Sequence, residues 1–203
     1  MDHIQTDSEH LHRLLDGMAN AVAASGYAAT TIADIVRLAG VSRRTFYEHF
    51  STKQECFIAL YEAASLNALK VLRNAIDPAH DWHTQLERAM SAYLGSLAQN
   101  PVLMRTLFIE ILGLGEEGLA ARRRINEEIV AFMLKVVNGQ QSSHGPGKQQ
   151  PQQQQQPAVL SPDIAMALVG GINELVLQAI ERKRVDNLQD IVAPALLLIG
   201  AVT

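Results

Sequence analysis

Two adjacent arginines, Arg43 and Arg44, stand within a run of side chains whose chemistry suits nucleic acids. Each planar guanidinium group can donate two hydrogen bonds at once to O6 and N7 of guanine. Hydroxyl, imidazole and ammonium groups on either side suit phosphate oxygens, which fix the register of a protein on duplex DNA. The residues that we predict to contact DNA are Thr31, Ser42, Arg43, Arg44, Thr45, Tyr47, His49 and Lys53.

The two arginines are not equivalent. Glu48 follows Arg44 by about one helical turn, so the two side chains can form an ion pair. That pair would leave the Arg44 guanidinium less available for contacts with bases. We therefore expect Arg43 to be the freer reader of base edges.

Two short helices joined by a tight turn would position these side chains. Thr31 can cap the first helix, with Asp34 in capping-box position, and Gly40 ends it. Ser42 can cap the second helix, on which Phe46 faces inward. Two such helices form a helix-turn-helix, whose second helix enters the DNA major groove. A further capping box is expected from Ser51 and Gln54, at the start of the next helix.

A longer set of residues at fixed spacing surrounds this motif: Thr31, Ile35, Ala39, Gly40, Val41, Ser42, Thr45, Phe46, Tyr47, His49, Phe50 and Lys53. With these residues the stretch resembles the N-terminal DNA-binding domain of the TetR family of bacterial transcriptional regulators. The resemblance implies a three-helix head that reaches back to about Ser8, and a helical domain that dimerises and binds a small molecule. It thus implies a regulator, usually a repressor, that leaves its operator when an effector binds.

Composition favours an all-α protein. The chain has 203 residues, of which 48% are hydrophobic and only 5% aromatic, and alternating polar and apolar residues are scarce. We expect a DNA-binding domain over residues 1–52 and an effector-binding and dimerisation domain over 53–203. The net charge is −4, so a DNA footprint must be a local basic edge rather than a basic domain.

Localisation follows from what the sequence lacks. The single cysteine, Cys56, excludes an internal disulfide and is expected to be a buried small hydrophobe. The acidic N-terminus does not resemble a signal peptide. No apolar run was expected to reach the roughly 20 residues of a membrane span. These features predict a cytoplasmic protein without membrane attachment.

Helical periodicity divides the chain into successive elements. The predicted helices are about Ser8–Ser25, Lys53–Ile76, Asp81–Gln99, Asn100–Gly113, Glu116–Val137, Ser161–Lys183 and Asn187–Ala201. Arg123 with Glu127 and Arg124 with Glu128 would form ion pairs on a solvated face. A Gln- and Pro-rich stretch at about 139–158 is predicted to be a flexible loop.

The last two predicted helices carry wide apolar stripes, and Gly170 with Gly171 would permit close helix contact. We expect these helices to form a homodimer interface, as the TetR resemblance also implies. The candidate interface residues are Leu168, Val169, Ile172, Val176, Ile191, Ala195 and Ile199. A symmetric dimer would read a palindromic operator.

Polar residues on apolar faces mark candidate contacts to an effector of unknown identity. The candidate residues, with their possible apolar walls, are Met90, Tyr93, Leu97, Met104, Phe108, Glu110, Phe132, Met133, Asn173 and Glu174. Structural hydrogen bonding or core packing is the alternative for each of them. Trp82 is expected to cover the edge of the core.

Two other classes of function remain open. A regulator controlled by a protein partner would keep the DNA-binding head but lack the pocket. A helical enzyme would need catalytic or metal-ligating residues, for which His80 and His83 are the remaining close pair. We predict no catalytic residue, no metal site and no cofactor.

Overall fold

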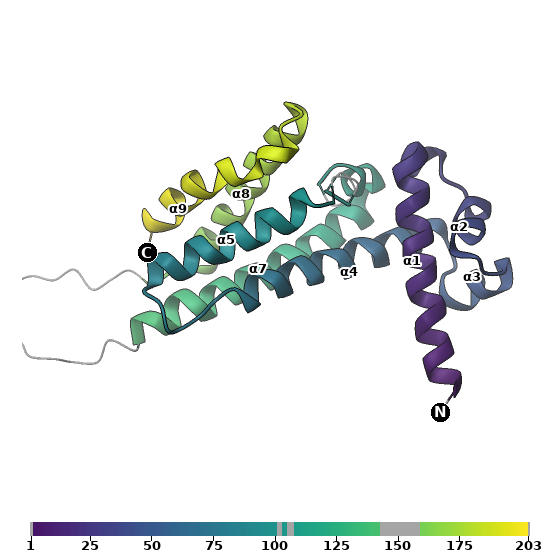
Figure 1. Cartoon of the computed structure of the whole chain (residues 1–203), viewed down its shortest axis with the longest axis horizontal. Helices are drawn as coiled ribbons and strands as arrows, with labels where there is room; N and C mark the ends of the chain where they lie inside the picture. The colour runs from purple at the N-terminus through teal and green to yellow at the C-terminus, as the bar shows by residue number, and fades with distance from the viewer. Residues whose placement is uncertain (1, 101–102, 105–107, 143–158, 203) are drawn as a thin grey trace, which may run out of the picture. The chain divides into compact units, whose positions relative to one another are not determined.

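The computed structural model describes residues 2–100, 103–104, 108–142 and 159–202, and over these ranges it contains helices and no strand. The all-α prediction is confirmed. The chain divides into two compact units (Figure 1). Unit 1 comprises Met1–Asn67 and Asn100–Arg122, and unit 2 comprises Ala68–Gln99 and Arg123–Thr203. The predicted boundary at residue 52 therefore does not coincide with a boundary between compact units.

Unit 1 is built on α1 (Asp2–Ala29), α2 (Ile32–Ala39) and α3 (Arg43–His49). It also contains the first part of α4 (Lys53–Asn74), the short helix η1 (Glu110–Leu114) and the start of α7 (Gly115–Ser142). Its core is fully buried and consists mainly of large apolar side chains: Leu14, Met18, Ile35, Phe46, Phe57 and Ile111. Leu14 and Met18 stand one helical turn apart on α1, and the other four come from α2, α3, α4 and η1, so each of these elements turns an apolar side chain inward.

Local capping sets the ends of the two short helices, as the sequence predicts. The hydroxyl of Thr31 accepts from Asp34 N at 3.2 Å, and Asp34 Oδ2 accepts from Thr31 N at 3.2 Å, which completes the capping box. Gly40 ends α2 in the left-handed conformation with φ 63°, which a glycine adopts without strain. Ser42 Oγ accepts from Thr45 N at 3.0 Å and starts α3.

Close contact between α1 and α2 holds the motif on its scaffold. A Cβ at Gly17 would lie 2.6 Å from Ile35 O and 2.9 Å from Ala39 Cβ, so only glycine lets α2 approach this near. Arg13 donates to Ala39 O at 2.9 Å and to Gly40 O, and thereby satisfies carbonyls at the end of α2.

The cap of α4 differs from the prediction by one residue. Thr52 Oγ1 accepts from Glu55 N at 3.1 Å, and Glu55 Oε2 accepts from Ser51 N at 2.6 Å. The expected box of Ser51 and Gln54 is therefore wrong. Gln54 instead donates to Glu117 Oε2 of α7 at 2.8 Å.

Unit 2 contains α5 (Trp82–Ala98), α8 (Pro162–Glu181), η2 (Val185–Ile191) and α9 (Val192–Gly200), with the later parts of α4 and α7. Asp81 and Ser161 cap α5 and α8, at the predicted starts of these helices. Asn138 near the end of α7 donates to Leu160 O and accepts from Leu160 N, at 3.2 and 3.1 Å. The helix α7 continues to Ser142, beyond the predicted start of the Gln-rich loop, and residues 143–158 of that loop lie outside the described residues.

One helix of unit 2, α8, is strongly apolar. By length and composition α8, with 20 residues and a mean hydropathy of 1.4, could cross a membrane. A core helix meets the same criteria, and among the described residues no other helix does. The helix turns Ala165, Leu168 and Val176 into the core of unit 2, which is ordinary for the central helix of a helical domain.

The predicted dimer-interface residues lie in that core. All seven are buried by the chain itself: Leu168, Val169, Ile172, Val176, Ile191, Ala195 and Ile199. Periodicity identifies the apolar face of a helix but not the element that covers it, and the homodimer interface itself stays a prediction. The exposed apolar side chains of the same helices are Ile164, Leu197 and Leu198, at 44%, 75% and 42% exposure.

Candidate DNA-binding helix and ligand pocket

The helix α3 presents its polar side outward. Arg43 and Arg44 occupy its first two positions and are exposed, and Tyr47 follows on the exposed side. Arg44 Nε donates to Glu48 Oε1 at 3.0 Å, which confirms the predicted pair. Arg43 makes no hydrogen bond or ion pair within the described chain. Its guanidinium is thus available to a ligand, at the helix end that reaches base edges in a helix-turn-helix.

Aromatic packing fixes the orientation of α3. Phe46 is fully buried, with its ring centroid 5.5 Å from that of Tyr47 and 5.8 Å from that of Phe50. Rings at these separations add specific contacts to their apolar burial. Because Phe46 faces the core, the residues at the start of α3 face solvent.

The three hydroxyl residues predicted to contact DNA, Thr31, Ser42 and Thr45, also form hydrogen bonds within the protein. Ser42 and Thr45 are linked through their hydroxyl oxygens at 2.9 Å, beside the cap that starts α3. The Thr31 hydroxyl donates to Asp34 Oδ2 at 2.6 Å. This bond is the largest cause that lowers the pKa of Asp34 below its ordinary value, followed by a hydrogen bond from Arg37. All three hydroxyl residues stay predicted DNA contacts, since each oxygen has further hydrogen-bonding capacity.

Lys53 does not match its predicted role as a phosphate contact. Its Nζ donates to Tyr27 O at 2.9 Å and to Thr30 O at 2.8 Å, and lies 4.4 Å from the centroid of the Tyr27 ring. A cation suits the carbonyl groups at the C-terminal end of a helix. In this structure Lys53 fastens the start of α4 to the end of α1.

His49 also faces the protein. Its side chain is 10% exposed, and Nε2 lies 3.4 Å from Asp7 Oδ1 of α1. The structure thus gives His49 a partner within the protein, and its contact with a DNA phosphate stays a prediction. Neither Lys53 nor His49 could be assigned from the sequence, because the partners lie far away along the chain.

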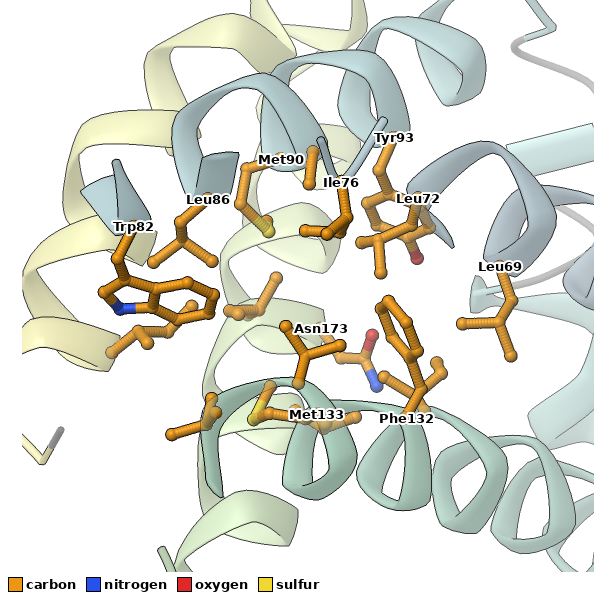
Figure 2. A pocket seen from close by; sticks show the side chains of 17 residues that line it. Leu69, Leu72, Ile76, Trp82, Leu86, Met90, Tyr93, Phe132, Met133 and Asn173 are labelled. Carbon is orange, nitrogen blue, oxygen red and sulfur yellow. The ribbon is translucent and has the colours of Figure 1, made fainter. Parts of the chain in front are cut away.

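A hollow lies inside unit 2 and is lined by residues of α4, α5, α7, α8 and α9 (Figure 2). Its volume is about 70 Å³, several times the roughly 10–15 Å³ that one water needs. The lining residues are Leu69, Leu72, Ile76, Trp82, Leu86, Ala89, Met90, Tyr93, Ile129, Phe132, Met133, Val136, Val137, Val169, Ile172, Asn173 and Ile199. Its apolar lining with few polar groups is that of a small-molecule site, while its volume is below the roughly 300–1,000 Å³ of pockets for drug-sized ligands, so such a ligand requires the lining side chains to move.

Half of the predicted effector contacts meet in this hollow, namely Met90, Tyr93, Phe132, Met133 and Asn173. The other five do not line it. Leu97 is buried elsewhere in unit 2, Glu174 is exposed on α8, and Met104, Phe108 and Glu110 belong to unit 1. Their assignment is wrong for this hollow, because a polar residue in an apolar run can equally well face solvent or another core.

Sequence reasoning missed several walls of the hollow. Trp82 was expected at the core edge, yet Figure 2 shows its indole at one end of the hollow. Val169, Ile172 and Ile199 were assigned to a dimer interface but line the hollow instead. No single-residue signal separates an apolar wall of a pocket from ordinary core.

Polar groups at the hollow are few. Asn173 Nδ2 donates to Asn126 Oδ1 at 3.4 Å. Behind one wall, Arg73 Cζ lies 5.5 Å from the centroid of the Phe132 ring, and Arg73 Nη2 lies 3.6 Å from Glu128 Oε2. The predicted pair of Arg124 and Glu128 thus has a competitor in Arg73. Arg123 forms no ion pair with residues that the structure places, so its predicted pair with Glu127 is absent.

The structure also gives the positions of the other groups that could bind a metal or react. Among the described residues no group of three or more His, Cys, Asp or Glu side chains is placed to hold a metal ion. His80 Nε2 lies 3.8 Å from Asp77 Oδ2. Cys56 is fully buried, as predicted, and burial raises the pKa of its thiol to about 12.

Comparisons with known proteins agree with this geometry. Residues 14–60 match the model of bacterial regulatory proteins of the tetR family. Over 117 residues the chain is 33% identical to the HTH-type transcriptional regulator TtgR of Pseudomonas putida, which covers 57% of this chain and 46% of the relative. The chain thus matches less than half the length of this curated relative.

Solved structures share the fold over nearly the whole chain. The regulator FadR of Bacillus subtilis, in complex with stearoyl-CoA, has a TM-score of 0.75 at 17% identity and covers 95% of this chain and 99% of its own. SmeT, repressor of the Stenotrophomonas maltophilia multidrug efflux pump SmeDEF, has a TM-score of 0.70 at 20% identity, over 94% and 89%. Residues 14–60 thus carry the DNA-binding motif of the TetR family of bacterial transcriptional regulators, and the helical body has the fold of these solved regulators.

Proposed function

We propose that this protein is a transcriptional repressor that binds a palindromic operator as a homodimer and releases it when a small molecule occupies the hollow of unit 2. The observation that carries the proposal is the exposed start of α3, where the unpaired Arg43 stands on a helix oriented by the buried Phe46. Guanidinium groups at that position read guanine in the major groove.

The neighbours in fold support ligand control. FadR was solved with stearoyl-CoA, and SmeT represses a multidrug efflux pump. The hollow in unit 2 supplies this chain with a candidate effector site. A ligand that binds one conformation better than another shifts the population toward the first. We propose that effector binding disfavours the conformation that holds DNA.

The helix α4 is the proposed link between effector binding and DNA binding. It begins at Lys53, whose Nζ donates to Tyr27 O in α1 and to Thr30 O just after α1. Its later residues Leu69 and Leu72 line the hollow. A ligand that displaces Leu69 or Leu72 would act on the same helix that is attached to the DNA-binding motif.

Selection of duplexes from a random-sequence pool tests the DNA-binding part. We expect an enriched inverted repeat, and the absence of any enriched sequence would contradict the proposal. A chemically diverse set of small molecules is then tested for release of that duplex. If none releases it while a cellular protein does, control by a protein partner is the better account.

A further inference from the structure

We propose that the hollow of unit 2 binds an uncharged, mainly apolar aromatic molecule that carries one hydrogen-bond donor, such as a small substituted phenol. This inference rests on the proposed function, since it names the chemical class of the effector. It depends on three observations: the absence of charge in the walls, an open acceptor on Asn173, and the kinds of side chain that surround it.

The walls exclude a charged ligand. None of the seventeen lining residues carries a formal charge. A carboxylate, phosphate or ammonium group placed among them would lose its hydration without gaining an opposite charge. Such a group shifts its protonation or stays out of the site.

The cation behind the wall does not change this conclusion. Arg73 lies against Phe132, but its guanidinium is already 3.6 Å from the carboxylate of Glu128. An anionic ligand that reached Arg73 would also meet Glu128, and the like charges would repel each other. The ion pair therefore disfavours carboxylates at this end of the hollow.

Asn173 supplies the polar contact. Its Nδ2 is engaged with Asn126, whereas its Oδ1 accepts no hydrogen bond from any described residue. Figure 2 shows Asn173 among the side chains that face the hollow, near Phe132. A carbonyl oxygen at an apolar surface selects a ligand that donates, because an amide oxygen left without a donor on binding would oppose it. A hydroxyl or N–H group on the ligand meets this requirement.

The remaining walls suit an aromatic ring. Trp82, Tyr93 and Phe132 offer ring faces and edges, and Met90 and Met133 offer polarisable thioethers that adapt to ligands of different outline. Trp82 is the single tryptophan of the chain, so its fluorescence reports directly on occupation of the hollow.

Three probes of the same skeleton test the proposal on the full chain: 4-propylphenol, 4-propylanisole and 4-propylbenzoate. Binding is followed by Trp82 fluorescence, excited at the red edge of the indole band, and by calorimetry. We expect the phenol to bind about fivefold more tightly than the anisole, which lacks the donor, and the benzoate to bind at least about tenfold more weakly than the phenol at neutral pH.

Two variants test whether the preference for the phenol over the anisole depends on Oδ1 of Asn173. Asn173→Leu removes the acceptor, so phenol and anisole should bind equally well. Asn126→Leu removes the neighbouring amide and leaves Oδ1 of Asn173, so the preference for the phenol should persist. Equal affinity of the wild type for phenol and benzoate, an unchanged preference in Asn173→Leu, or no binding of the phenol would each overturn the proposal.

The effect of each probe on the selected operator duplex is measured separately. If the probes bind in the expected order but none releases DNA, the chemistry of the hollow stands and the ligand-controlled repressor is refuted. If the benzoate releases DNA and the phenol does not, the repressor stands and the proposed effector class is refuted.

Discussion

Arg44 and Glu48 form an ion pair on the exposed side of α3, with Arg44 Nε 3.0 Å from Glu48 Oε1. An exposed pair of this kind adds little to the free energy of unfolding. On a DNA-binding helix the pair has a larger effect on affinity for DNA, because the Glu48 carboxylate partly neutralises Arg44 close to the DNA phosphates. Replacing Glu48 with a neutral residue removes its negative charge without changing the packing of the core.

Glu48→Gln should therefore tighten binding to all duplexes alike and steepen the salt dependence of the association constant, because Arg44 then interacts with phosphates at full charge. Affinity measured at several salt concentrations tests this. Thermal unfolding of the variant should match the wild type. An unchanged affinity and slope would mean that Arg44 stays away from DNA.

Lys53→Met should lower the free energy of unfolding by about 1.5–3 kcal/mol, since hydrogen bonds from an ammonium group to Tyr27 O and Thr30 O are lost. Urea unfolding measures the loss, and Lys70→Met, at an exposed position of the same helix, is the matched control. If Lys53→Met leaves stability unchanged but flattens the salt dependence of DNA binding, Lys53 contacts phosphate.

Gly17→Ala should destabilise the protein by about 1–3 kcal/mol, because the new Cβ would overlap Ile35 O and Ala39 Cβ. Helix propensity alone predicts the opposite sign, a gain of up to about 1 kcal/mol. Gly139→Ala, at a helical position where the added Cβ would meet no other element within 4 Å, should show that small gain. Equal effects of both variants in urea unfolding would contradict the close approach of α1 and α2.

The buried thiol of Cys56 makes stability depend on alkaline pH. Burial raises its pKa from 9.0 to about 12, so between these values the folded protein holds a proton that the unfolded chain has lost. Stability should be fully present below about pH 9 and fall as the pH rises toward 12. Cys56→Ala should be less stable at neutral pH but show a shallower decline. Equal slopes for the two proteins would refute this assignment.

Self-association is predicted through the exposed apolar residues of α8 and α9. Light scattering should report about twice the chain mass of 22.2 kDa. Leu197→Arg, at a side chain 75% exposed, should give the single-chain mass, while Leu66→Arg, at an exposed position of unit 1, should not. A monomeric wild type at micromolar concentration would contradict both the homodimer and the palindromic operator.

The DNA-binding motif could be predicted from the sequence because short-range interactions define it. Thr31 and Asp34, Gly40, and Ser42 and Thr45 act on neighbours within one turn. The contacts of Lys53 with Thr30 and of His49 with Asp7 span many residues, so their polar side chains looked equally suited to phosphate.

The hollow could be predicted only in part for a related reason. Asn173 and Tyr93 interrupt apolar runs and were identified, but an apolar wall such as Val169 has the same periodicity as a core or interface residue. Which element covers a face is a property of the tertiary packing, and the pattern of one helix does not contain it.

The most direct test of the proposed function compares Arg43→Ala with the wild type on single-base variants of the selected operator, at several salt concentrations. We expect the substitution to cost about 1–3 kcal/mol per half-site and to abolish preference at one base position in each half-site. Tyr47→Phe, which removes a hydroxyl on the same exposed side, should weaken all variants alike. If Arg43→Ala also weakens every operator variant equally, Arg43 contacts only phosphate and this helix does not read sequence through it.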